Sequence, residues 1–333
     1  MHRRHRTWTA ALALLLLAAS AGCSRKGKSG ELTIAVIPKG TTHEFWKAIH
    51  AGAVKAEREL NASGTKVAIS WKGPLREDDR EQQVQVVEGF VSQNVSGIVI
   101  APLDESAIVR PVEEAARAGI PTVVIDSALD TDKIVSFVAT DNTKGGEMAA
   151  DRMGELLKGA GKVLLLRYQE GSASTTAREI GFMAELKAKY PGITVKSSDQ
   201  YAGPTRDTAK RTSENLLNRY ANEVQGIFCV NESSTHGMLL ALQDIGKAGK
   251  IAFIGFDPSQ VFIDALNNGQ MQGLVVQNPM NMGYLGVTKM VAHLQGKPVE
   301  PRIDTGVWMI TKDNMAQPQS GELLHPPVEK YLN

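Results

Sequence analysis

Short apolar runs alternate with helix-like segments along the chain from Thr33 onward. The runs are apolar throughout instead of alternating with polar residues, which is typical of parallel strands covered on both faces. Between them, residues such as Ile49, Ala53 and Ala56 recur at the spacing of one helical face. Strands are expected at 33–37, 67–71, 97–101, 122–125, 135–139, 163–166, 194–198, 226–230, 251–255 and 274–276. This alternation predicts an α/β, doubly wound architecture.

The number of expected strands predicts two lobes. Ten strands are too many for one compact domain in a chain of 333 residues, so two parallel-sheet lobes of about five strands each are expected. The segment from Asp141 to Gly146 is polar and Gly-rich and follows a strand, which makes it a candidate for the first crossover. Residues 316–333 are interrupted by Pro and Gly and are expected to wrap the surface.

Four of the apolar runs end at a hydrogen-bonding side chain, namely Asp126, Asn231, Asp257 and Gln277. In an open parallel sheet, ligands bind beyond the carboxyl ends of the strands. A carboxylate there can accept from two vicinal hydroxyls at once. Each Asp could instead cap the following helix, and Asp257 before Pro258 fits such a cap. Because the four polar residues stand at equivalent strand ends, together they favour a polar ligand pocket.

Further candidate side chains flank these strand ends. Phe45 and Trp46 open the first helix, and at least one of the two rings should face the pocket, where it could pack on the C–H face of a sugar. Lys39 and His43 could donate to ligand oxygens or be solvated loop residues. Arg178 could hold ligand oxygens with its planar fork of donors, but from its position alone a surface ion pair with a nearby Glu is favoured.

The net charge and the lack of catalytic sequence motifs argue against several classes of function. The formal charge of +1 gives no field that would attract nucleic acid or an anionic membrane. The chain has no Gly-x-Ser-x-Gly nucleophile elbow, no His spacing typical of a metal site and no dinucleotide-binding glycine pattern. We therefore expect no catalytic residue, no metal and no cofactor. A glycosidase that uses Asp126 and Asp257 as paired carboxylates is the enzyme alternative.

The first residues are expected to be an export signal. Basic residues precede the apolar stretch 10–19, which is too short to span a bilayer by itself. Ser20-Ala21-Gly22-Cys23 follows and resembles the lipobox of bacterial lipoproteins, which implies lipidation at Cys23 and a polar tether at 24–31. Ser20 departs from the aliphatic residue usual there, and ordinary signal cleavage is the alternative. Cys229, the other cysteine, lies in an apolar run and is expected to be a core residue.

The order of these elements resembles the periplasmic sugar-binding proteins of the ribose and related pentose and hexose type, which feed ABC importers. The resemblance runs from about Leu32 to Ile310. The motifs that carry it are individually short but stand in order at similar spacing. They are Ile34-Ala35-Val36-Ile37 with Phe45-Trp46, Ile120 to Asp126, Thr140-Asp141-Asn142 with Gly145-Gly146, Arg178-x-x-Gly181-Phe182, Asn231-Glu232, Gly255-Phe256-Asp257, and Gln277.

The resemblance implies a set of ligand-binding residues and marks where this chain departs from the ribose type. The ring-stacking pair corresponds to Phe45 and Trp46, where Trp46 replaces a smaller Phe. Lys39 stands where the ribose type has Ser, His43 where it has Asn, and Ser127 where it has Arg. A Lys at position 39 is similar to the autoinducer-2 and rhamnose-type receptors, so the resemblance does not identify ribose as the ligand. The ligand-binding residues expected are Lys39, His43, Phe45, Trp46, Asp126, Ser127, Arg178, Asn231, Asp257 and Gln277.

Charge balance among these positions favours a neutral, hydroxyl-rich ligand. Lys39 and Arg178 balance Asp126 and Asp257, and a buried uncompensated charge costs several kcal/mol. A sugar acid or phosphate would need more positive charge, from protonated His43 or from Lys47 turned inward. The expected ligand is therefore a monosaccharide or polyol.

The resemblance also implies the domain organisation and the partners. The expected segments are a lipoprotein-type signal at 1–23, the tether at 24–31, an N-terminal lobe of 32–140 plus 278–306, a C-terminal lobe of 141–277 plus 307–315, and a C-terminal wrap at 316–333. The lobes would be joined by a three-strand hinge, as in the type I periplasmic binding protein fold, and would close on the sugar and present a surface to an ABC permease. The protein is expected to be a periplasmic or otherwise extracytoplasmic monomer. A receptor for autoinducer-2 or an acidic sugar, coupled to uptake or to signalling, remains the alternative.

Overall fold

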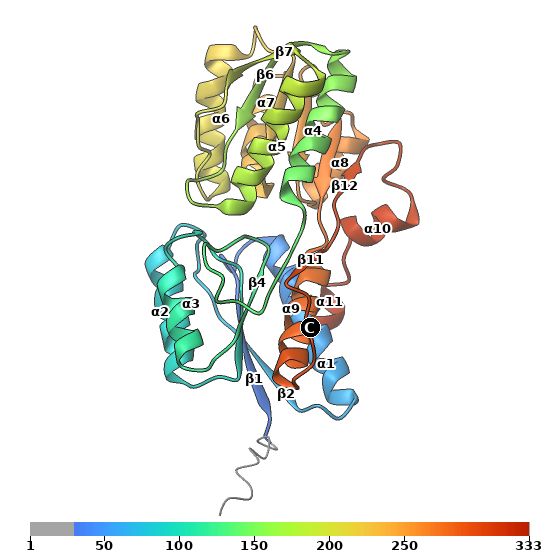
Figure 1. Cartoon of the computed structure of the whole chain (residues 1–333). Coiled ribbons are helices and arrows are strands. Elements are labelled where there is room, and N and C mark those ends of the chain that lie inside the picture. The colour runs from blue at the N-terminus through green and yellow to red at the C-terminus, as the bar shows by residue number, and fades with distance from the viewer. Residues whose placement is uncertain (1–29, 333) are drawn as a thin grey trace, which may run out of the picture. The chain divides into compact units, whose positions relative to one another are not determined.

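The computed structural model describes residues 30–332, and their strands form two six-stranded sheets (Figure 1). In spatial order the first sheet is β11-β5-β4-β3-β1-β2 and the second is β12-β10-β9-β8-β6-β7. The strands of the first sheet are β1 (Leu32–Ile37), β2 (Val67–Trp71), β3 (Gly97–Ile100), β4 (Thr122–Ile125), β5 (Ser136–Ala139) and β11 (Arg302–Asp304). Those of the second are β6 (Ala160–Leu166), β7 (Gly192–Ser197), β8 (Gly226–Cys229), β9 (Ala252–Phe256), β10 (Gly273–Val276) and β12 (Trp308–Ile310).

The strand pairing follows the apolar pattern of the sequence. Every pair is parallel except β10 with β12, which is antiparallel. All ten strands expected from the sequence are present, with small shifts at their ends. The two strands that sequence reasoning did not place, β11 and β12, have three residues each and only one wholly buried residue between them. Such short, half-exposed strands carry no continuous apolar run.

Helices cover both faces of each sheet. Those against the first sheet are α1 (Glu44–Ala62), α2 (Arg80–Ser92), α3 (Val109–Arg117) and α9 (Pro279–Leu294). Those of the second sheet are α4 (Asn142–Leu157), α5 (Ala173–Lys189), α6 (Arg206–Tyr220), α7 (Glu232–Asp244) and α8 (Gln260–Asn267). In the first lobe, Ile34 and Ala35 of β1 belong to different core clusters, because successive side chains of a strand point to opposite faces.

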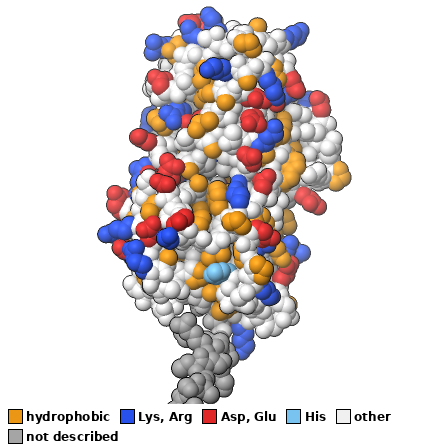
Figure 2. Space-filling model, viewed as in Figure 1, with side chains coloured by type: hydrophobic (Ala, Val, Ile, Leu, Met, Phe, Trp, Pro, Cys, Tyr) orange, Lys and Arg blue, Asp and Glu red, His pale blue; other side chains and the backbone are white. Residues whose placement is uncertain are grey.

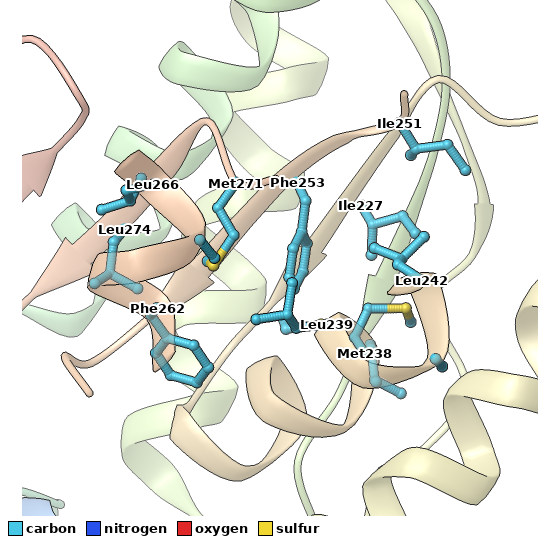
Figure 3. Close-up of a cluster of buried hydrophobic side chains, with 14 of the residues drawn as sticks. Ile227, Met238, Leu239, Leu242, Ile251, Phe253, Phe262, Leu266, Met271 and Leu274 are labelled. Carbon is cyan, nitrogen blue, oxygen red and sulfur yellow. The ribbon is translucent and has the colours of Figure 1, made fainter. Parts of the chain in front are cut away.

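The second lobe also has a core on each face of its sheet. Figure 3 shows one of these clusters, in which Phe253 of β9 lies among apolar residues of α7 and α8, such as Leu239 and Phe262. Cys229 is wholly buried in the same cluster, so the expectation of a core cysteine is confirmed. These packed sheets hold the strand ends in fixed positions.

The chain crosses between the sheets three times. It leaves the first sheet after β5, returns from β10 into α9, and passes from β11 to β12. The predicted class, α/β with two doubly wound lobes joined by a three-strand hinge, is confirmed. Here "first lobe" means the first sheet with its helices, and "second lobe" means the second sheet with its helices.

Glycines bring two helix pairs into unusually close contact, one pair in each lobe. A Cβ on Gly52 of α1 would lie 1.9 Å from the Met280 carbonyl oxygen of α9. A Cβ on Gly146 of α4 would lie 2.0 Å from the carbonyl oxygen of Arg178 on α5. Neither contact leaves room for a side chain. The second of them sets where α5 carries Arg178.

The C-terminal segment contacts both lobes. Leu323 and Leu324 of α10 (Pro318–Leu324) join a core cluster of the second lobe. The last helix, α11 (Glu329–Leu332), packs on α1 of the first lobe, where Arg58 donates to the carbonyl oxygens of Lys330 and Tyr331 at 3.0 Å each (Figure 1). The segment thus links the lobes outside the three crossings.

The described surface mixes charges of both signs. Figure 2 shows basic and acidic side chains interspersed over the face in view. Within residues 30–332, no helix combines the length and apolarity needed to cross a bilayer. The expected signal, Cys23 and nearly all of the expected tether lie outside the described residues.

Candidate ligand-binding site

A narrow cavity of about 40 Å³ lies between the two lobes at the carboxyl ends of their strands. Nine of the ten predicted site residues line it, and they come from both lobes. The lining residues are Lys39, His43, Phe45, Trp46, Glu77, Asp126, Tyr168, Ser174, Thr175, Arg178, Asn231, Glu232, Asp257 and Gln277.

Asp126 and Asp257 occupy equivalent places in the two lobes. Each directly follows a central strand, β4 or β9, and each has a left-handed backbone, with φ of 64° and 65°. Their N–H groups donate to the neighbouring strands, at Val138 and Val275. Non-Gly residues rarely adopt this conformation, and where they do it is often at a functional site. The turn directs both carboxylates into the cavity.

The alternative role of Asp257 as a helix cap is wrong. The N-cap of α8 is Ser259, two residues later. The side chain of Asp257 instead accepts a hydrogen bond of 2.7 Å from Nε2 of Gln277. Burial raises the pKa of Asp257 to about 6, with the charges of Asp126 and Glu232 adding to the effect and Arg178 and Gln277 opposing it.

The surface ion pair favoured for Arg178 is also wrong. Its side chain is buried, and its Nε and one terminal nitrogen donate at 2.8 Å to Oδ1 of Asn142 and to the carbonyl oxygen of Val230. The guanidinium stacks 3.7 Å from the centre of the Phe256 ring. Burial lowers the pKa of Arg178, and the charges of Asp257 and Asp126 oppose that effect. These contacts hold the guanidinium rigidly against the cavity.

Lys39 crosses the space between the lobes. Its Nζ lies 3.4 Å from Oδ2 of Asp126 in its own lobe and donates at 3.2 Å each to the hydroxyls of Ser172 and Ser174 in the other. Ser127 is the one predicted site residue outside the cavity wall. Its hydroxyl accepts the backbone N–H of Ser174 at 3.1 Å, so it bridges the two lobes.

The aromatic pair lies at the start of α1. Phe45 and Trp46 pack edge to face, with centroids 5.0 Å apart, and both line the cavity. Trp46 is nearly buried and donates from Nε1 to Oε1 of Glu77 at 2.7 Å. Nδ1 of His43 lies 2.7 Å from the same oxygen. Although burial lowers the pKa of His43, its hydrogen bond to Glu77 and the negative charge of Glu77 outweigh burial and raise it.

Asn231 both caps a helix and lines the cavity. Its side-chain oxygen accepts from the Ser234 backbone N–H at 3.3 Å, in a capping box at the start of α7. Its Nδ2 donates to the Ser233 hydroxyl at 3.1 Å. The cap fixes the amide at the cavity wall.

Sequence reasoning missed five lining residues, namely Glu77, Tyr168, Ser174, Thr175 and Glu232. Tyr168 follows β6 by two residues and Glu232 follows Asn231, so the strand-end argument could have included both. Ser174 and Thr175 lie in the first turn of α5. Glu77 lies in the irregular segment before α2, where no periodic pattern marks it.

The sequence matches a family model described as a periplasmic binding protein domain over residues 34–298. The ribose import binding protein of Bacillus subtilis is 30% identical over 289 residues, which are 87% of this chain and 90% of that protein. The D-allose-binding periplasmic protein of Escherichia coli is 31% identical over 277 residues, which are 80% of this chain and 86% of that protein.

Solved structures agree with this family. A carbohydrate transporter solute-binding protein from Agrobacterium radiobacter, in complex with D-arabinose, superimposes with a TM-score of 0.84 at 34% identity, covering 89% of this chain and all of that one. A solute-binding protein from Agrobacterium vitis with bound D-fucose superimposes with a TM-score of 0.83 at 34% identity. The match covers 88% of this chain and 100% of that one. With the family model and the fold in agreement, this chain belongs to the periplasmic binding proteins, in the ribose-type group of sugar-binding proteins of ABC importers.

Proposed function

We propose that this protein captures a neutral monosaccharide or polyol for an ABC importer. The observation that carries the proposal is the convergence of Asp126, Asp257, Gln277 and Arg178, with the rings of Phe45 and Trp46, on one cavity between the lobes. Carboxylates and an amide suit the ring-edge hydroxyls of a sugar, and an aromatic face suits its C–H surface. Two of the relatives described above are named for ribose and allose, and the two solved structures contain D-arabinose and D-fucose, which supports this ligand class.

The charges around the cavity support a neutral ligand. Besides Lys39, Arg178, Asp126 and Asp257, the wall includes Glu77, paired with His43, and Glu232, paired with Arg206 outside the wall. These charges cancel when His43 is protonated and leave one negative charge when it is neutral. Lys47 is exposed and paired with Glu44, so it adds no positive charge to the cavity. An acidic sugar would add a negative charge that the wall does not compensate, which disfavours the acidic-ligand alternative.

The mechanism we infer is capture by closure of the two lobes. Residues of both lobes contact the cavity, so a ligand held by Asp126 on one side and Asp257 on the other binds the closed form best. That difference in affinity shifts the population toward the closed form. The moving bodies would be residues 32–140 plus 278–306 and 141–277 plus 307–315, with 316–333 lying across them.

The location and partners follow from the family and from the first residues of the chain. Membership in the periplasmic binding proteins implies an extracytoplasmic protein. We propose that it acts as a monomer, that Cys23 carries the lipid anchor, and that the closed lobes present a surface to a membrane permease. Mass spectrometry of membrane fractions should find an acylated Cys23, and a mature N-terminus at Gly22 without lipid would reject the anchor.

A ligand screen by thermal shift and calorimetry tests the function. Neutral pentoses, hexoses and polyols are compared with sugar acids and autoinducer-2, and one neutral sugar should stabilise the protein by about 4 kcal/mol at a thousandfold excess over its Kd. Asp126→Ala and Asp257→Ala should abolish the shift while the protein stays folded, whereas Asp244→Ala on the exposed end of α7 should retain it. The proposal fails if no neutral sugar or polyol binds, or if both pocket variants bind as the wild type does.

A further inference from the structure

Glu77 is a buried carboxylate that belongs to no helix or strand. It stands in the segment between β2 and α2, and only 6% of its surface is exposed. Gly40 makes room for it, since a Cβ there would lie 2.7 Å from Cγ of Glu77. From the second lobe, the side-chain amide of Gln169 donates to the Glu77 carbonyl oxygen at 2.8 Å. The residue is therefore held in place from both lobes.

The two carboxylate oxygens of Glu77 bind side chains of different lobes. Oε1 contacts two groups of its own lobe, Nε1 of Trp46 and Nδ1 of His43, each at 2.7 Å. Oε2 accepts from the hydroxyl of Tyr168, in the second lobe, at 2.6 Å. If the lobes separate, the bonds to Trp46 and His43 can persist, while the Tyr168 bond must break.

The protonation states make the Tyr168 bond strong. Burial alone would raise the pKa of Glu77, but the hydrogen bonds from His43, Tyr168 and Trp46 and the His43 charge outweigh it and lower the pKa to about 2. Burial, with the adjacent Glu77 charge, raises the pKa of Tyr168 well above its ordinary value. The bond is thus a charge-assisted O–H···O⁻ contact between buried groups, which is roughly twice as strong as a neutral one.

We propose that Glu77 is a positioning residue that couples the orientation of Trp46 at the cavity wall to closure of the two lobes, with its Tyr168 bond as the closure latch. This role deepens the proposed function, because a ring held by Glu77 is in place for the sugar before the second lobe arrives. When the lobes close, the Tyr168 hydroxyl replaces water as the hydrogen-bond donor to Oε2 of Glu77.

The latch can be tested without any ligand. Spin labels are attached to cysteines introduced as Arg110→Cys on α3 and Arg211→Cys on α6, two exposed positions. The labelled proteins also carry Cys23→Ser, and the remaining Cys229 is buried and unreactive. Pulsed dipolar spectroscopy of the ligand-free protein should show Tyr168→Phe shifted toward a second, open distance. The matched control is Tyr284→Phe, which removes a Tyr–Glu bond of 2.8 Å to Glu59 within the first lobe. Distances in Tyr168→Phe equal to those of the control would overturn the latch.

Sugar kinetics provide a second readout. With the sugar found in the screen, Tyr168→Phe should raise the dissociation rate about tenfold and leave the association rate unchanged, since losing a hydrogen bond to a charged group acts on the closed form. An unchanged dissociation rate counts against the latch while leaving the sugar-binding function intact. If the wild type binds no sugar but the label distances differ as expected, the proposed function fails and the latch stands.

The positioning role has its own spectroscopic test. In protein labelled with 5-fluorotryptophan, the ¹⁹F resonance of Trp46 is assigned by its loss in Trp46→Phe. Glu77→Ala should move this resonance, Glu77→Gln should restore it in part because the amide oxygen still accepts from the indole, and the Trp71 and Trp308 resonances should stay in place. A Trp46 resonance that is unmoved in Glu77→Ala or, where that variant does not fold, in the bulkier Glu77→Met would refute the positioning role.

Discussion

Gln277 donates from Nε2 to Oδ1 of Asp257 at 2.7 Å, and its own side-chain oxygen is buried without a partner among the described residues. Buried polar atoms are nearly always paired, so a free acceptor at the wall of a cavity indicates where a ligand hydroxyl donates. The bond to Asp257 also fixes which way the amide faces. The pair therefore provides the sugar with a carboxylate and an amide oxygen side by side.

Asp257 is expected to reduce the stability of the ligand-free protein. Its pKa is raised from 3.8 to about 6, so the fold favours the protonated form, and the carboxylate's contribution to stability falls as the pH rises between those values. Asp257→Asn keeps the acceptor for Gln277 and removes the charge. It should raise the free energy of unfolding at pH 7 by about 3 kcal/mol while abolishing sugar binding. Urea unfolding with and without the sugar measures both effects, and a destabilised variant would contradict the prediction.

Sugar affinity should fall as the pH drops below about 6. A carboxylate accepts hydroxyl hydrogens better than a carboxylic acid does, so protonating Asp257 weakens the complex, by up to about tenfold per pH unit. His43 also titrates in the cavity, while Glu77, with a pKa of about 2, stays charged. Titration calorimetry from pH 7 to pH 5 should therefore show the loss in wild type and in His43→Gln. A flat wild-type profile would exclude Asp257 as the acceptor.

Gly146 should be intolerant of even one extra methyl group. A Cβ there would meet the Arg178 carbonyl oxygen at 2.0 Å, so Gly146→Ala must push α5 away and move Arg178 from the cavity. We expect a loss of about 1–3 kcal/mol in stability together with weaker sugar binding. Gly89→Ala is the control, since Gly89 lies inside α2 with open space at its Cβ, and this change should be stabilising by about 0.5–1 kcal/mol. Equal melting temperatures for the two variants would speak against the close packing.

Removing the Lys39 ammonium should leave Asp126 unpaired in a buried setting. Lys39→Met is expected to destabilise the ligand-free protein by about 1–3 kcal/mol, because the carboxylate loses its ion pair and the serine hydroxyls lose their shared donor. Lys47→Met removes an exposed Lys and should change stability by less than about 0.5 kcal/mol. Chemical denaturation of the two variants compares them directly, and a Lys39→Met protein as stable as Lys47→Met would refute the pairing.

The C-terminal segment should restrain lobe opening. Deleting residues 325–333 removes α11 and its anchorage on Arg58 but leaves the three crossings and α10 in place. The ligand-free protein should then show a larger open population with the Arg110 and Arg211 spin labels. Arg58→Ala, which loosens only the anchorage, should give a smaller change in the same direction. Distances unchanged by the deletion would show that the segment does not limit opening.

The cavity residues recognised from the sequence are those attached to regular elements. Asp126, Asn231, Asp257 and Gln277 each follow a continuous apolar run, and a parallel sheet brings such ends to one edge. Glu77 could not be recognised in this way, because its segment has no periodic pattern and its place depends on the space at Gly40.

The local pattern by itself determined the succession of strands and helices, the division into two lobes and the polar strand ends, because apolar periodicity reflects which faces are buried. Only the tertiary structure decided what each polar group does. Arg178 has the same sequence neighbours whether it is solvated or buried, and its position against Asn142 and Phe256 depends on segments distant in the chain. The charge balance of the cavity likewise depends on Glu77 and Glu232, whose partners the order of residues does not reveal.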